Sequence, residues 1–149
     1  MQAQTGTKPL ADQNAIDIGA LTAYLERSLD GFAGPLQIEQ FKGGQSNPTY
    51  LLRTANQTCV MRSKPGPAAK LLPSAHAIER EFRVMKALAG SEVPVPRMVL
   101  LCEDEAVIGR AFYLMAFIEG RVLWDQSLPD LDRAARAATY DEMSRVIAA

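Results

Sequence analysis

The sequence predicts an α+β domain with an antiparallel sheet of about five strands, one helix inserted between strands and a further helix toward each end of the chain. Three observations predict this class. Short apolar runs bounded by turn residues fill much of the region from Leu36 to Ile118, a pattern typical of strands. Three other stretches carry apolar residues at helical spacing. The 149 residues, of which 48% are hydrophobic, suit one globular domain with an ordinary core.

The first residues divide into a tail and a helix. Residues 1–15 are polar, with too little apolar surface to order themselves, so we expect a disordered tail. Asp17 is suited to cap a helix and Asp30-Gly31 to end it. Four apolar residues recur between them at helical spacing, namely Ile18, Leu21, Leu25 and Leu29. The sequence therefore predicts a helix with one apolar face that packs on another element.

Five segments have the residue pattern of strands: 36–41, 49–54, 58–62, 98–102 and 111–118. The first three form a meander, because a glycine-containing loop and the turn 55–57 join them. After the last strand, Glu119-Gly120-Arg121 is suited to a hinge. A final helix is expected from about Leu131.

The inserted helix is predicted over residues 74–89, with Ser74 as its cap. At 100° per residue, its apolar arc consists of Ile78, Phe82, Met85, Leu88 and Ala89, and its polar side of Glu79, Arg80, Arg83 and Lys86. Glu81 falls inside the apolar arc, so its carboxylate should face the sheet, where it is costly without a cation. Arg62 and Lys64 share one face of the third strand, and either can supply that cation.

The glycine-containing loop joins the first two strands and is the leading candidate for a ligand site. Its sequence is Phe41-Lys42-Gly43-Gly44-Gln45-Ser46-Asn47-Pro48-Thr49-Tyr50. Paired glycines let a backbone approach an anion and present N–H groups to it, although a tight hairpin without a ligand is an alternative. Combined with a strand cation clamped by Glu81, the loop has the parts that hold a nucleotide's phosphates. A purely structural ion pair is the alternative for that clamp.

Five motifs, in order along the chain, resemble the aminoglycoside phosphotransferase-like family, and most closely its branch related to the phosphotransferase modules of certain acyl-CoA dehydrogenase fusion proteins. The motifs are the glycine loop, Val60-Met61-Arg62-Ser63-Lys64-Pro65, Glu79-Arg80-Glu81-Phe82, Val93-Pro94-Val95-Pro96 and Phe112-Tyr113-Leu114-Met115-Ala116-Phe117-Ile118-Glu119-Gly120. The resemblance covers roughly residues 36–149. It implies a protein-kinase-like N-terminal lobe (N-lobe) with one αC-like helix, and transfer of the ATP γ-phosphoryl group to a hydroxyl with Mg²⁺.

The resemblance also implies which residues bind the nucleotide. Five residues would form the nucleotide loop, namely Gly43, Gly44, Gln45, Ser46 and Asn47. Arg62 would replace the lysine that contacts phosphate in this family, with Glu81 as its helix partner, and Lys64 could share that contact. A planar guanidinium and a compact ammonium make different contacts, so the exact phosphate contact is left open. The adenine would meet the backbone of the segment linking the two lobes, which is Ala116, Phe117 and Ile118.

The catalytic loop of the family, with its His-x-Asp core, and its later metal-binding aspartate have no counterpart in these 149 residues. The single histidine, His76, falls in the first turn of the inserted helix, where a capping or solvent-facing role is expected. Three acidic groups, at 103–105, 130 with 132, and 141–142, are expected to be solvated surface. We therefore expect no catalytic residues and no metal ligands here. The chain would comprise an N-lobe over 16–118 and, over 119–149, the hinge and first helix of a truncated second lobe.

Composition limits the compartment and the partners. A net charge of −1 gives no general attraction to nucleic acid or to anionic lipid, and no apolar run is long enough to span a bilayer. Cys59 and Cys102 each lie in an apolar run, which favours two buried thiols in a reducing compartment. These observations predict a cytoplasmic protein that binds neither nucleic acid nor a membrane. The expectation of a nucleotide as its partner rests on the loop, the clamped cation and the resemblance described above.

Alternatives to an inactive phosphotransferase lobe remain at the sequence level. One is a non-catalytic nucleotide-binding or regulatory module, and another is a folded fragment without a ligand that associates with itself or with a missing lobe through its hinge side. The apolar face of the last helix, made of Tyr140, Met143 and Ile147, would serve such association. Trp124, just after the hinge, could form the floor of a ligand pocket or anchor its segment to the core.

Overall fold

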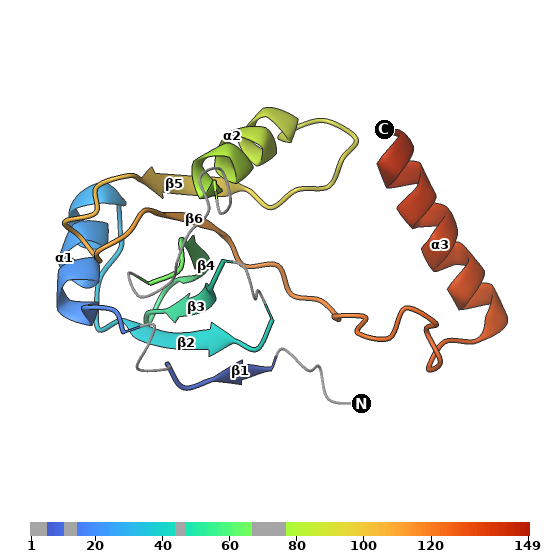
Figure 1. Cartoon of the computed structure of the whole chain (residues 1–149), viewed down its shortest axis with the longest axis horizontal. Coiled ribbons are helices and arrows are strands. Elements are labelled where there is room, and N and C mark those ends of the chain that lie inside the picture. Colours follow the sequence, from blue (N-terminus) through green and yellow to red (C-terminus); the bar gives the residue numbers. More distant parts are fainter. Residues whose placement is uncertain (1–5, 11–14, 44–46, 67–76) are drawn as a thin grey trace.

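The computed structural model describes residues 6–10, 15–43, 47–66 and 77–149. Within them the chain forms a six-stranded sheet and three helices (Figure 1). The strands are β1 (Thr7–Lys8), β2 (Gln37–Phe41), β3 (Thr49–Arg53), β4 (Thr58–Ser63), β5 (Met98–Cys102) and β6 (Phe112–Ala116). The helices are α1 (Ile18–Ser28), α2 (Ile78–Leu88) and α3 (Arg133–Ala148). The α+β class predicted from the sequence is confirmed.

All neighbouring strands in the sheet are antiparallel, in the order β1-β2-β3-β4-β6-β5. The predicted meander is β2-β3-β4. The sheet has one strand more than the sequence predicts, because β1 lies within the stretch expected to be disordered. Thr7 and Lys8 pair with Phe41 and Gln40 at the edge of β2. Backbone hydrogen bonds hold such an edge strand, so it needs no apolar residue pattern.

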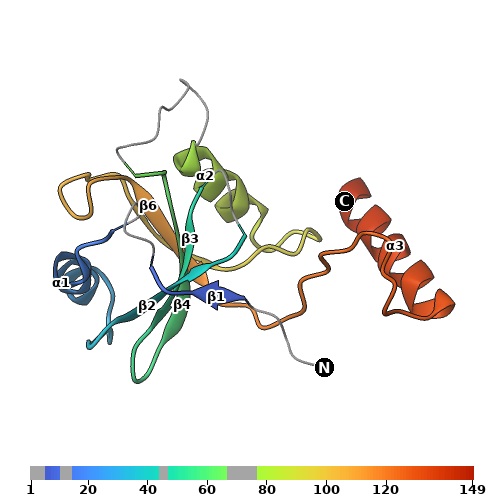
Figure 2. The same ribbon diagram turned by 60° about the horizontal axis from the view of Figure 1, so that its bottom comes forward.

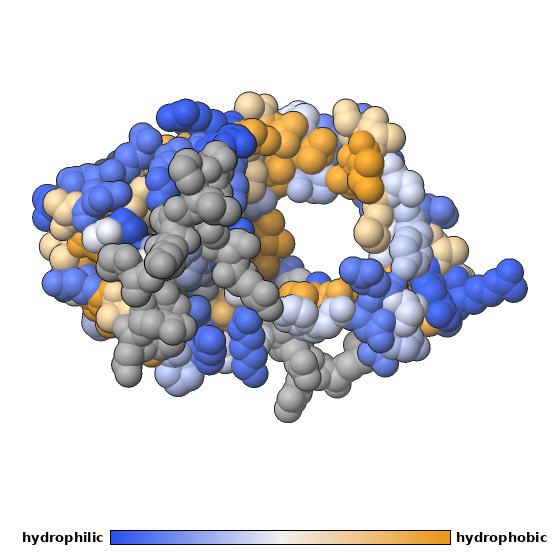
Figure 3. Space-filling model, in the orientation of Figure 1, coloured by the Kyte–Doolittle hydropathy of each residue, from blue (hydrophilic) through white to orange (hydrophobic). Residues whose placement is uncertain are grey.

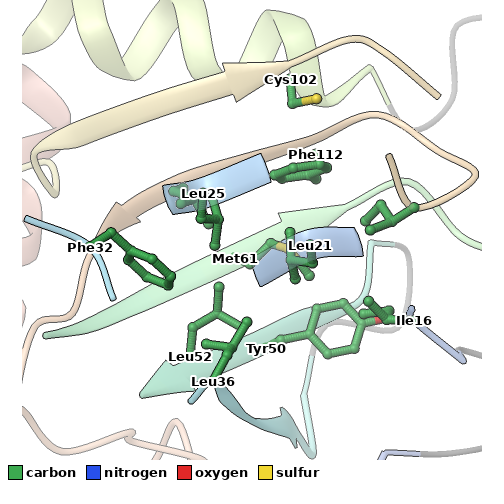
Figure 4. Packing of buried hydrophobic residues seen from close by; sticks show 12 residues of the cluster. Ile16, Leu21, Leu25, Phe32, Leu36, Tyr50, Leu52, Met61, Cys102 and Phe112 are labelled. Atoms are coloured by element: carbon green, nitrogen blue, oxygen red, sulfur yellow. The ribbon is translucent and has the colours of Figure 1, made fainter. Parts of the chain in front are cut away.

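Each face of the sheet is covered by a different helix (Figure 2). On one face, Leu21 and Leu25 of α1 are fully buried against residues such as Met61 and Phe112 (Figure 4). The predicted Asp17 cap is present, because its carboxylate accepts a hydrogen bond from the amide of Ala20 at 2.9 Å. The other face packs against α2 through Ile78, Phe82, Ala111 and Tyr113. Side chains alternate between the faces along each strand, so neighbouring residues belong to different clusters.

Helix α2 is shorter than predicted. It begins at Ile78 and ends at Leu88. The N-cap position is taken by Ala77, whose methyl group cannot accept a hydrogen bond from the first helical amides. Ser74, the predicted cap, lies outside the described residues. The last predicted strand is also shorter, because β6 ends at Ala116 and the next two residues belong to the linking segment.

Helix α3 follows a linking segment that leads away from the sheet (Figure 1). It begins after Asp132, whose carboxylate accepts a hydrogen bond from the amide of Ala135. None of its residues is buried, and the face formed by Tyr140, Met143 and Ile147 is exposed. Figure 3 shows an opening between α3 and the rest of the molecule, with hydrophobic side chains on its rim. None of the helices described is long and apolar enough to cross a membrane.

Candidate functional site

The centre of the candidate site is an ion pair between β4 and α2. Arg62 Nε donates to Glu81 Oε2 at 2.8 Å, and the two side chains are 27% and 36% exposed. The prediction that Glu81 faces the sheet and meets a strand cation is confirmed, and the cation is Arg62. The half-buried setting favours a fixed geometry over the mobile pairing of most surface ion pairs.

Lys64 has a different partner from the one that the sequence allowed. Its ammonium pairs with Glu79, which was predicted on the polar side of α2 and whose side chain is 19% exposed. Glu79 lies in the first turn, where a long side chain can curve from the helix side toward the strand. Burial acts against the charged carboxylate, but hydrogen bonding and the charge of Lys64 outweigh it and hold the pKa of Glu79 below its usual value.

Two further residues donate to Glu81. The hydroxyl of Tyr113 donates to Oε2 at 3.1 Å, and the amide nitrogen of Asn47 donates to Oε1 at 3.0 Å. Both residues are almost fully buried. Asn47, a predicted member of the nucleotide loop, therefore ties the end of that loop to α2.

Tyr113 and Thr49 bond to the two members of the ion pair, and the sequence predicted this role for neither of them. The ring of Tyr113 packs in the core, 6.0 Å from the ring of Phe82 between centroids. Strand register could have suggested its second role, because Tyr113 pairs directly with Arg62 across β4 and β6 and so shares its face. Thr49, also opposite Arg62, accepts a hydrogen bond from Arg62 Nη1 at 3.1 Å.

An apolar slot of about 380 Å³ lies beside this cluster. Its walls include Val60 and Met115 from the sheet and the three residues predicted to link the lobes, Ala116, Phe117 and Ile118. Ile118 is 63% exposed, so the slot opens to solvent at that side. The volume falls within the range of small-molecule sites.

A second hollow, of about 720 Å³, lies between α2 and the sheet. Arg62, Glu81 and Tyr113 line it, and Pro96 and Met115 line both this hollow and the slot. The two hollows are therefore neighbours, with the ion pair facing one and the linking segment bordering the other.

The beginning of the glycine loop contacts Trp124. A Cβ atom added at Gly43 would lie 3.3 Å from Cη2 of Trp124, so glycine permits this close approach. The indole is 62% exposed, so it does not anchor its segment in the core. Gly44, Gln45, Ser46 and His76 lie outside the described residues.

The three acidic groups are exposed, as the sequence predicts. Where the structure is described, no three His, Cys, Asp or Glu side chains come together as a candidate metal site. Cys59 and Cys102 are both free thiols.

The antiparallel sheet, the covering helix α2 and the Arg62–Glu81 pair define the N-lobe of a kinase-like phosphotransferase. The chain belongs to the phosphotransferase enzyme family, whose sequence profile matches residues 37–149. The resemblance identified from the five motifs is thereby confirmed.

Relatives are similar over nearly the whole chain but are much longer. The chain is 49% identical over 142 residues to acyl-CoA dehydrogenase family member 10 of Mus musculus, covering 95% of this chain and 13% of that protein. It is 44% identical over 145 residues to family member 11 of Gallus gallus, covering 94% and 18%. A crystal structure from Ralstonia eutropha, described as a candidate aminoglycoside phosphotransferase, is 60% identical with a TM-score of 0.74, over 91% of this chain and 38% of that one.

Proposed function

We propose that this chain is the nucleotide-binding lobe of a small-molecule phosphotransferase that moves the γ-phosphoryl group of ATP to a hydroxyl. The observation that carries the proposal is the Arg62–Glu81 pair. Glu81 holds the guanidinium of Arg62 at 2.8 Å from its carboxylate, beside an apolar slot. Family membership supports the reaction class. Because the chain spans less than two fifths of the length of the relatives named above, the activity belongs to the proposal.

The slot is suited to the adenine ring. Val60 and Met115 offer apolar surface to a planar base. The Ala116 amide already donates to the carbonyl of Arg97 at 2.8 Å, so the backbone groups proposed to meet the base are those of Phe117 and Ile118. A few polar groups on a largely apolar lining are typical of cofactor sites. The slot also borders the strands that flank the glycine loop, so a base in it would direct its phosphates toward Arg62.

Arg62 is suited to the phosphates. Its guanidinium donates through Nε to Glu81 and through Nη1 to Thr49, which fixes the plane of the group. Its Nη2 atom has no hydrogen-bond partner among the described residues. Charge-assisted hydrogen bonds from a fixed guanidinium to phosphate are among the stronger polar contacts in proteins.

We assign no metal site and no catalytic base to this chain. The family implies Mg²⁺, but the described residues bring no group of carboxylates together, and the sequence has no His-x-Asp motif. Phosphoryl transfer needs a positioned base and carboxylates that hold the metal. The proposal is therefore that the 149 residues alone bind ATP without transferring its phosphate.

The proposal is tested by titrating the 149-residue chain with ATP. Trp124 is the single tryptophan and contacts Gly43, so its fluorescence should report binding, and calorimetry gives an independent affinity. We expect binding weaker than micromolar. In the variant Arg62→Met the affinity should fall about tenfold, whereas Arg62→Lys should retain part of it. Equal affinity of Arg62→Met and the native chain would overturn the proposal, as would the absence of binding at millimolar ATP.

A further inference from the structure

Glu81 receives hydrogen bonds on both carboxylate oxygens from three different elements. Oε2 accepts from Arg62 on β4 and from Tyr113 on β6, and Oε1 accepts from Asn47 at the end of the glycine loop. The terminal torsion of a glutamate side chain is otherwise broadly distributed. Donors on both oxygens fix the plane of this carboxylate.

The orientation of Arg62 depends on that fixed plane. Its Nε atom bonds to the same oxygen that accepts the Tyr113 hydroxyl, at 2.8 Å and 3.1 Å respectively. Because the guanidinium is rigid, the direction of the Nε bond sets the direction of the third nitrogen, Nη2. A rotation of the Glu81 carboxylate would therefore turn the phosphate-binding edge of Arg62.

We propose that Tyr113 is a positioning residue, whose hydroxyl holds Glu81 in the orientation that aims Arg62 at the phosphates of a bound nucleotide. The inference rests on the proposed function, because it names a further determinant of the same site. Tyr113 does not itself need to touch the nucleotide phosphates. It acts through Glu81.

The chemical state of Tyr113 suits this role. Burial raises the pKa of its phenol above the ordinary value, and the negative charge of Glu81 raises it further. The hydroxyl therefore keeps its proton at neutral pH and remains a donor. Its ring is held independently by packing against Phe82, so removal of the oxygen alone leaves the ring in place.

The test compares Tyr113→Phe with Tyr50→Phe. Tyr50 is a matched control, because it is also fully buried on the sheet and its hydroxyl accepts a hydrogen bond from Arg110, but it belongs to the α1 cluster on the other face. Tyr113→Phe should weaken ATP binding about fivefold and leave adenosine binding unchanged, since adenosine has no phosphate. Tyr50→Phe should change neither affinity.

A double-mutant cycle separates positioning from general structural support. In the Arg62→Met background, Tyr113→Phe should have no further effect on ATP affinity, because the group that it orients is gone. A loss that persists in that background, or an equal loss for adenosine, would overturn the inference.

A measurement without nucleotide distinguishes this inference from the proposed function. The Arg62 Nε–H signal in NMR, assigned by its loss in Arg62→Lys, should exchange with solvent faster in Tyr113→Phe than in the native chain or Tyr50→Phe. Unchanged exchange would overturn the role of Tyr113 even if ATP binds. Absence of ATP binding by the native chain would overturn the proposed function, and the exchange rates would still decide whether Tyr113 holds the ion pair.

Discussion

Phe112 and Tyr113 are adjacent on β6 but belong to opposite faces of the sheet. Phe112 packs in the cluster beneath α1, where the ring of Tyr24 meets it edge-on at 5.9 Å between centroids. Tyr113 packs beneath α2 and bonds to Glu81. The face beneath α1 is therefore an apolar core, whereas the face beneath α2 carries the candidate site. Substitutions on the two faces should have different consequences.

Leu25→Ala should reduce the free energy of unfolding by about 2–5 kcal/mol, because the side chain is fully buried in the α1 cluster and its loss leaves a cavity. Ile18→Ala in the same helix is the control. Ile18 is 43% exposed, so its replacement should cost less than about 1 kcal/mol. Urea unfolding measures both. Equal losses would contradict the packing of α1 described above.

Glu81→Gln should lower ATP affinity about tenfold, because it removes the charge that holds Arg62 while keeping the shape of the side chain. Glu39→Gln is a matched control. Glu39 pairs with Arg53 at 3.3 Å, with side chains 41% and 48% exposed, away from the slot. Calorimetry should find unchanged ATP affinity for the control, and a similar loss in both variants would speak against a specific role for Glu81.

The Glu79–Lys64 pair should make stability depend on pH in the acid range. The pKa of Glu79 is lowered in the folded chain from an ordinary value of 4.5. The contribution of the ionised Glu79 to the free energy of unfolding is therefore complete above that value. It is lost as the pH falls, because the unfolded chain binds the proton at a higher pH than the folded chain does. The stability difference between the native chain and Glu79→Gln should be about 0.5–1 kcal/mol near neutral pH and should shrink below pH 4.5. Chemical unfolding at several pH values would refute this if the difference grew as the pH fell.

Cys59 should react slowly with alkylating reagents while the chain is folded. Burial raises the pKa of its thiol to about 11 from an ordinary 9.0, which lowers the thiolate fraction at pH 8 by about a hundredfold. Mass spectrometry of the chain treated with iodoacetamide, with and without denaturant, measures this. Cys59 is partly buried, not fully buried as the sequence predicted, and its rapid labelling in the folded chain would contradict even this partial burial.

Periodicity predicted the sheet, the helices and the direction of Glu81, because apolar spacing is set by the faces that a strand or helix buries. It did not predict β1, since an edge strand of two polar residues carries no such spacing. It also could not fix the ends of α2, where Ala77 takes a position that a capping residue usually occupies.

The sequence did not predict which residues pair with one another within the candidate site. Arg62 and Lys64 lie on one strand face, and spacing alone does not decide which of them meets Glu81 or Glu79. Tyr113 satisfies the core pattern with its ring, so nothing in its neighbourhood along the chain indicates that its hydroxyl reaches a charged group. Trp124 contacts Gly43 across a large sequence separation, and only the fold brings the two together.

NMR of the isotopically labelled chain during an ATP titration tests most directly whether the nucleotide occupies this site. The account predicts that the backbone amides of Gly43, Arg62, Phe117 and Ile118 shift together with one affinity, while those of Leu21 and Leu25 beneath α1 do not move. Shifts confined to the α1 face, or no shift in any of these amides at millimolar ATP, would contradict it.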